Sequence, residues 1–236
     1  SESWQFRDYV IHSFNDDKPY RDFVREQLAG DVLSPVTREG IAASGFLVAG
    51  PWDEVQNVGK SATEKLRARE EQLEELVAAV GQAFLGLTVH CSRCHDHKFD
   101  PITQREFYQF SAALGGTYHG DERESLAEFA KPEVERRISA LDAEIEGIDA
   151  RAASADEPTK RELAVQRSRR EAVRRLLQGG PVHTTVPKQP GAWRILARGD
   201  FKQPGEVVAP RGIVAVSGVL PDWKLPETST EADRRK

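Results

Sequence analysis

The two cysteines of the chain lie one helical turn apart, and a histidine follows them directly. They form the sequence Cys91-Ser-Arg-Cys94-His95. C-x-x-C-H is the motif of covalent haem c attachment, because two thiols at this spacing reach the two vinyl groups of one haem. The next residue then directs its imidazole at the iron. The sequence therefore predicts that Cys91 and Cys94 bind haem c covalently and that His95 is the proximal iron ligand.

Other interpretations of the cysteines stay open. A zinc site could use Cys91, Cys94 and His95 or His97, but a closed structural site needs a fourth ligand and there is no second cysteine pair. Asp96-His97 resembles the Asp-His pair of HNH-type nucleases, although the net charge of −5 argues against nucleic-acid binding. A dithiol redox pair normally follows a strand of a βαβ unit, which the sequence does not show. Plain core cysteines fit poorly beside so many charged neighbours.

An apolar run precedes the motif and is suited to wall a macrocycle. Phe84 and Leu87 lie in this run and are expected to contact the haem. Gly86, between them, permits close approach of the backbone. His97 lies two residues beyond His95, so we expect it to hydrogen-bond a haem propionate or to orient the iron ligand.

The sixth ligand of the iron is the main chemical question. The chain contains 0 methionines, so the usual His/Met pair is excluded. His119 lies beyond the Gly115-Gly116 break, on a segment that could fold back over the haem, and is the candidate distal ligand. Tyr118, a lysine or an open position are the alternatives.

The sequence predicts that the elements that position these residues are mainly α-helices. The apolar spacing of the first 90 residues is typical of successive helices. Ser61-Ala-Thr-Glu64 and Thr103-Gln-Arg-Glu106 are capping boxes. They predict a long helix from about 62 to 87 and a short helix that ends at Gly115-Gly116. Residues 53–60 are expected to form an ordered loop.

A change in pattern after residue 130 predicts an antiparallel coiled-coil hairpin. Apolar residues spaced by four and three mark one arm: Val134, Ile138, Leu141, Ile145 and Ile148. That arm is mostly acidic, and the arm that follows Pro158 is mostly basic, so the two are complementary in charge.

The chain therefore divides into four predicted parts. Residues 1–130 form a helical haem-binding domain and 131–180 form the inserted hairpin. Residues 181–225 form a short β-rich segment that packs on the first domain, with strands expected at Trp193–Ala197 and Gly212–Ser217. Residues 226–236 are polar and are expected to be a disordered tail. No run of 18 apolar residues exists, so no membrane span is expected.

Several stretches resemble one known family. Phe84–Ile102 is similar to the signature of the large planctomycete cytochrome-c-type proteins, whose central domain is catalogued as a domain of unknown function. Phe6–Ile11 with Glu26–Asp31, and Gly45–Asp53, agree with the same family. His119–Arg123 resembles a further element, here with one extra residue. Leu196–Asp200 resembles the opening of the family's next domain.

The resemblance implies export to the periplasm, where haem c is attached, and a place in a larger redox protein. Together with the motif, it leads us to expect one covalent haem and electron transfer to a redox partner protein or to other domains of a longer chain. A haem enzyme or small-ligand sensor with an open sixth position, and a zinc-binding structural module, are the alternatives. The hairpin could also join two copies into a homodimer.

Overall fold

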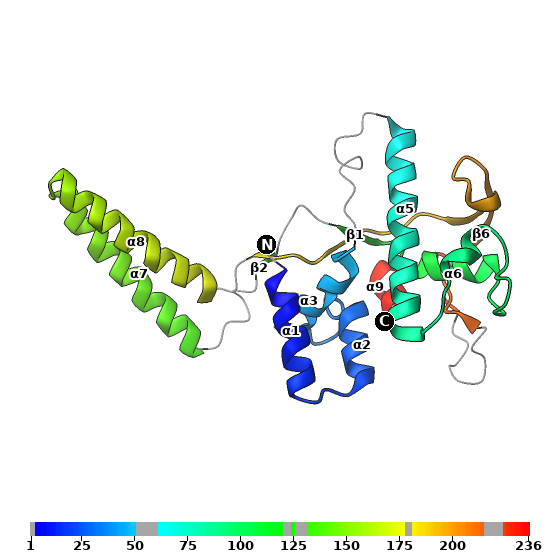
Figure 1. Cartoon of the computed structure of the whole chain (residues 1–236), viewed down its shortest axis with the longest axis horizontal. Helices are drawn as coiled ribbons and strands as arrows, with labels where there is room; N and C mark the ends of the chain where they lie inside the picture. Colours follow the sequence, from blue (N-terminus) through cyan, green and yellow to red (C-terminus); the bar gives the residue numbers. More distant parts are fainter. Residues whose placement is uncertain (1–2, 51–60, 120–123, 126–131, 178–180, 215–223) are drawn as a thin grey trace.

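A computed structural model describes the chain except for residues 1–2, 51–60, 120–123, 126–131, 178–180 and 215–223. The loop expected at 53–60 and the second half of the strand expected at Gly212–Ser217 therefore lie outside the described residues, and the first half, 212–214, does not form a strand. The described part is mainly helical, as predicted, and its strands pair into 2-stranded antiparallel sheets. Figure 1 shows a helical body from which one helical hairpin projects.

The chain begins with a small group of packed helices. Tyr9 and Phe23 stack across the first two helices, with ring centroids 5.9 Å apart. The elements of this group are α1 (Trp4–Asn15), α2 (Tyr20–Ala29), α3 (Arg38–Ala43) and the 3-10 helix η1 (Ser44–Val48).

Helix α5 (Ala62–Val80) begins at the predicted capping box and ends earlier than predicted. The Glu64 amide donates to Ser61 Oγ at 3.1 Å, and the Ser61 amide donates back to the Glu64 carboxylate. The sequence predicted a helix to residue 87, but a π turn, η2 (Gly81–Leu85), follows instead. Gly86 then turns the chain in the left-handed region, with φ +65°, which a glycine adopts without steric cost.

Helix α6 (Gln104–Leu114) begins at the second predicted capping box, Thr103 with Glu106. Together with α5 it forms the main core of the body. Buried residues from η1, the segments flanking the motif and the C-terminal region complete this core. Its members, including those of α5 and α6, are Leu47, Val77, Val80, Val89, Ile102, Phe107, Tyr108, Leu114, Leu196, Val208 and Ile213.

The predicted antiparallel hairpin consists of α7 (Pro132–Ala153) and α8 (Glu157–Leu177). Leu141, Ile148 and Leu163 are buried between its arms. Ion pairs cross the arms as the charge pattern predicted, from arginines of α8 to carboxylates of α7: Arg167 to Asp149, Arg170 to Glu144 and Arg174 to Asp142.

Short strands connect the hairpin and the C-terminal region to the body. The pairs are β1 (Thr117–His119) with β4 (Thr185–Pro187), β2 (Glu124–Ser125) with β3 (Pro181–Val182), and β5 (Trp193–Leu196) with β6 (Pro204–Val208). Strand β5 lies where a strand was predicted. A 3-10 turn, η5 (Ala197–Gly199), follows it.

The prediction that residues 226–236 form a disordered tail is wrong. They contain the helix α9 (Glu231–Arg235), and the Arg235 side chain is fully buried. Its guanidinium donates to both Asp31 carboxylate oxygens, at 2.6 and 2.8 Å, and also pairs with Glu231. Composition misled the prediction, because a polar sequence can be ordered by a buried charge network that its own local pattern does not reveal.

Candidate functional site

The C-x-x-C-H motif forms one helical turn on the surface of the body. The 3-10 helix η3 (His90–Arg93) carries it, and the Cys94 amide donates to Cys91 O at 3.4 Å. Both cysteines are free and exposed, and His95 is exposed as well. Cys91 lies in this turn, Cys94 ends it and His95 follows directly, so the two thiols and the imidazole are exposed within five consecutive residues.

The two residues between the cysteines face inward and anchor the turn. Ser92 is fully buried, and its hydroxyl donates to Ile102 O at 3.3 Å. The Arg93 guanidinium donates to the Glu74 carboxylate of α5 at 2.6 Å. Because these contacts fix the inner face, the turn can hold its outer groups in a defined orientation.

Helix α6 holds the backbone of the same turn. Arg93 O accepts hydrogen bonds from Gln104 Nε2 at 2.8 Å and from the Tyr108 hydroxyl at 3.1 Å. Burial raises the pKa of Tyr108, so its phenol keeps the proton that it donates. The motif is therefore held by contacts from both α5 and α6.

The environment of His95 selects one tautomer of its imidazole. His95 Nδ1 lies 2.7 Å from the backbone carbonyl oxygen of Asp96. A carbonyl oxygen only accepts hydrogen bonds, so Nδ1 carries the proton and Nε2 keeps its lone pair. The Asp96 carboxylate in turn accepts the Gln104 amide at 2.8 Å, at the start of α6. His95 is thus prepared to bind a metal through Nε2, with its ring held by a carbonyl.

His97 organises the loop after the motif. Its side chain is 9% exposed, and its Nδ1 accepts backbone hydrogen bonds from Phe99 at 3.3 Å and Asp100 at 2.9 Å. Its own amide donates to Ile102 O at 2.8 Å. The structure therefore leaves Nε2 as the atom of His97 for the predicted hydrogen bond to a propionate.

The apolar side chains around the motif range from half-buried to exposed. Phe84 is half-buried and packs against Phe46, with ring centroids 4.9 Å apart, and Leu87 is also half-buried. Leu85 is 37% exposed and Phe99 is 84% exposed. Phe99 is a large apolar side chain that the body itself does not cover, five residues beyond Cys94.

The structure places His119 in β1, and no described contact joins it to the motif, so its role as distal ligand stays a prediction. The motif contacts the start of α6, whereas His119 lies in β1, beyond the other end. The 11 residues of α6 span about 16 Å at 1.5 Å per residue. Figure 1 shows β1 and β6 on opposite sides of α5. The His119 ring instead faces that of His183, with centroids 6.3 Å apart.

Burial determines the protonation of His119 in β1. It lowers the pKa of His119 to about 4, with smaller effects of His183 and Arg69 in the same direction. Arg69 reaches the neighbouring backbone, donating to Gly115 O at 2.9 Å and Thr117 O at 2.8 Å. Because burial and the nearby positive charge of Arg69 both disfavour protonation, the imidazole of His119 is favoured in its neutral form.

Sequence reasoning missed one residue that contacts the cysteines. A Cβ placed on Gly199 would lie 2.9 Å from Cys94 Sγ. Gln104 also connects the two regions, because its Nε2 donates to Leu196 O at 3.2 Å as well as to Arg93 O. No local pattern could reveal these contacts, which join residues about 100 positions apart in the chain.

The zinc-site alternative receives no support from the part of the chain that the structure describes. Within it, no three side chains of histidine, cysteine, aspartate or glutamate come together in a metal-binding arrangement. His97 Nδ1 is bound to the loop backbone, so that nitrogen is not free to complete a set with Cys91 and Cys94.

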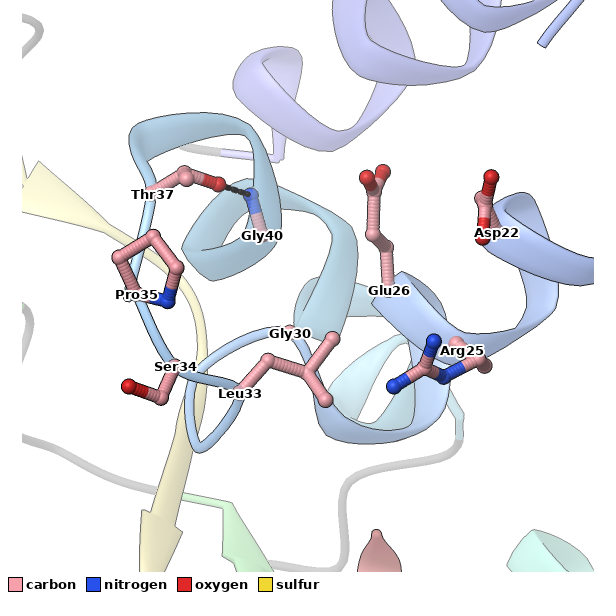
Figure 2. A pocket seen from close by; sticks show the side chains of 9 residues that line it. All are labelled: Asp22, Arg25, Glu26, Gly30, Leu33, Ser34, Pro35, Thr37 and Gly40. Atoms are coloured by element: carbon pink, nitrogen blue, oxygen red, sulfur yellow. Dashed lines mark hydrogen bonds between the residues drawn. The ribbon is translucent and has the colours of Figure 1, made fainter.

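A separate polar pocket lies between α2 and α3 (Figure 2). Thr37 Oγ1 accepts the Gly40 amide at 3.0 Å on one side of it. Glu26, on the other side, is paired with Lys18. The residues that line the pocket are Asp22, Arg25, Glu26, Gly30, Leu33, Ser34, Pro35, Thr37 and Gly40. None of them belongs to the C-x-x-C-H turn or contacts it through a described hydrogen bond.

Fold and site together define a mainly helical protein that presents a C-x-x-C-H turn on its surface. A family model described as PSCyt2, protein of unknown function (DUF1549), matches residues 1–119. This is half of the 236 residues and includes the whole motif. The chain belongs to this family.

Comparison with curated proteins and with solved structures gives no match. Among the described residues, no helix is both long and apolar enough to cross a membrane.

Proposed function

We propose that this chain is a c-type cytochrome that carries one covalently attached haem and transfers electrons. The observation that carries the proposal is the outer face of the motif turn. It presents two free thiols and an imidazole whose Nε2 is available, while the inner face is anchored to α5 and α6. These are the donor groups that haem c requires.

The proposed attachment is the addition of each cysteine thiol across one vinyl group of the haem. Each cysteine sulfur bonds to the inner carbon of a vinyl group, and the thiol hydrogen goes to the outer carbon. The addition consumes the C=C bond and needs no net oxidant or reductant. Cys91 and Cys94 form the two thioethers, and the Asp96 carbonyl holds the His95 ring for coordination through Nε2. The bound haem then supplies one-electron chemistry at its iron.

The surface position of the motif supports electron transfer to a protein partner. Because both cysteines and Phe99 are exposed, a haem attached there would have its attached edge near the outside of the body. The partner is proposed to be a separate redox protein or another domain of a longer chain, in the periplasm. The exposed apolar side chains of Val165 and Val173 on α8 are consistent with the further proposal of a homodimer through the hairpin.

A second candidate function is a haem enzyme or small-ligand sensor with an open sixth position. The engagement of His119 with His183, and of His97 with its own loop, favours it. Neither histidine is oriented by the described contacts toward the outer face of the motif.

The test is periplasmic expression of the chain with a haem c attachment system. We expect a red protein whose colour survives acid-acetone extraction and whose mass rises by one haem. The Cys91→Ala/Cys94→Ala double variant is the matched control and should lose covalent haem. A colourless wild-type protein that contains stoichiometric zinc would overturn the proposal. Carbon monoxide added to the ferrous protein then separates a closed sixth position from an open one.

A further inference from the structure

A tight turn from the C-terminal region lies against Cys94. It is formed by η5 and Asp200, and the Asp200 amide donates to Ala197 O at 3.0 Å. Gly199 is buried in this turn. A Cβ placed on it would lie 2.9 Å from Cys94 Sγ and 3.5 Å from Arg93 Cγ. The backbone of the turn thus occupies one side of this sulfur.

The backbone conformation of the turn is unusual for its sequence. Arg198 has φ 53° and ψ 29°, and Gly199 has φ +74°. Two successive left-handed residues define a type I′ turn, which favours glycine, asparagine or aspartate. An arginine in this conformation is unfavourable, and such outliers are retained where the surrounding structure or a function requires them.

Contacts on both sides fix the turn in this position. The Ala197 amide donates to Gln203 O at 3.1 Å, and the Asp200 carboxylate accepts the Lys202 amide at 2.9 Å. Gln104 holds Leu196 O and Arg93 O with one side-chain amide. Because the same amide holds the turn and the motif, Gly199 cannot move away from Cys94 without breaking these bonds.

We propose that Gly199 is part of the haem-attachment site and determines whether Cys94 forms its thioether. Attachment replaces the thiol hydrogen with a carbon of the macrocycle, so the sulfur needs more space than it does as a free thiol. The absent side chain of Gly199 supplies that space. Cys91, at the other end of the motif, does not depend on it. This inference rests on the proposed haem attachment and adds a residue from outside the motif.

Gly199→Ala, expressed with the haem c attachment system, tests the proposal. We expect haem bound through Cys91 alone in most of the protein. The α band of the pyridine haemochrome should then shift to longer wavelength, because one vinyl group stays conjugated. After unfolding, Cys94 should react with maleimide, adding one label per chain. Cys94→Ala defines the spectrum of the single thioether.

Asp17→Val is the matched control. Asp17 also has a left-handed φ, of 49°, and is exposed in the turn between α1 and α2. A β-branched residue is unfavourable in this conformation, so the variant introduces backbone strain without approaching a cysteine sulfur, and both thioethers should form. If Gly199→Ala does not fold, the Arg198→Gly/Gly199→Ala variant relieves the neighbouring left-handed residue and keeps the Cβ at position 199.

The outcomes separate this inference from the proposed function. Two thioethers in Gly199→Ala, or in the double variant, would overturn the role of Gly199 and leave the cytochrome assignment intact. A single thioether in Asp17→Val as well would assign the effect to backbone strain and would also overturn the role of Gly199. A wild-type chain without covalent haem would overturn both.

Discussion

The imidazole of His95 is held by the carbonyl of the next residue, Asp96, with Nδ1 and O separated by 2.7 Å. This contact fixes the tautomer of a ring that otherwise has no buried neighbour. It leaves Nε2 as the nitrogen of His95 that carries a lone pair. Asp96 directly follows His95, so this orientation of the ring is set by neighbouring residues of the chain.

Replacement of His95 should separate haem attachment from iron ligation. In His95→Ala, we expect Cys91 and Cys94 to retain their thioethers while the iron loses its nitrogen ligand, so the ferric spectrum changes to a high-spin form. Visible spectroscopy and intact mass check this. His90→Ala is the control, because His90 is exposed and adjacent to the motif; its spectrum should match the wild type. An unchanged spectrum in His95→Ala would assign the proximal ligand elsewhere.

His119 should make the stability of the protein depend on pH. Its pKa is about 4 in the folded protein and 6.5 ordinarily. Between these values the unfolded state binds more protons, so stability is complete above about pH 6.5 and falls as the pH is lowered toward 4. Urea unfolding at pH 7.5, 6 and 5 measures this loss, which His119→Gln should reduce. His12→Gln, at an exposed histidine of α1, is the control for the histidine-to-glutamine substitution itself.

Arg235 should be the most important charged residue for stability. Its removal in Arg235→Ala leaves the carboxylates of Asp31 and Glu231 without their buried partner. The expected cost is about 3–5 kcal/mol in the free energy of unfolding. Arg7→Ala removes an exposed pair with Asp8 and should cost about 0–1 kcal/mol. Similar urea midpoints for the two variants would show that α9 contributes little to the fold.

The hairpin should be dispensable for the site and necessary for the proposed homodimer. If a short Gly/Ser linker replaces 132–177, haem content and spectrum should match those of the full chain. The full chain should sediment as a dimer and the shortened chain as a monomer. Val165→Ser/Val173→Ser tests the same contact with the hairpin intact, since both side chains are exposed on α8. A full chain that sediments as a monomer would contradict the dimer.

Features set by neighbouring residues could be predicted from the sequence. The two capping boxes begin helices where expected, because each involves residues only three apart. The hairpin was also predictable, since its apolar spacing and opposite charges both favour one pairing. The C-x-x-C-H turn is local in the same sense, because its backbone hydrogen bond joins Cys91 and Cys94, which are three residues apart.

Features set by distant contacts could not be predicted. Nothing near residue 235 indicates that Asp31 binds it, so α9 was expected to be disordered. The position of His119 depends on the direction of α6 and on pairing with β4, which the loop sequence does not encode. Gly199 is an ordinary turn glycine in the sequence, and only the fold shows that it lies against Cys94.

The two ends of the hairpin insertion meet where the short strands β2 and β3 pair with each other. An insertion whose ends are adjacent adds length to the chain without separating the residues on either side of it. During evolution, such a segment can be lengthened, shortened or exchanged while the C-x-x-C-H turn and its braces stay under independent selection. We therefore expect the hairpin to vary among members of this family far more than the motif that the body supports.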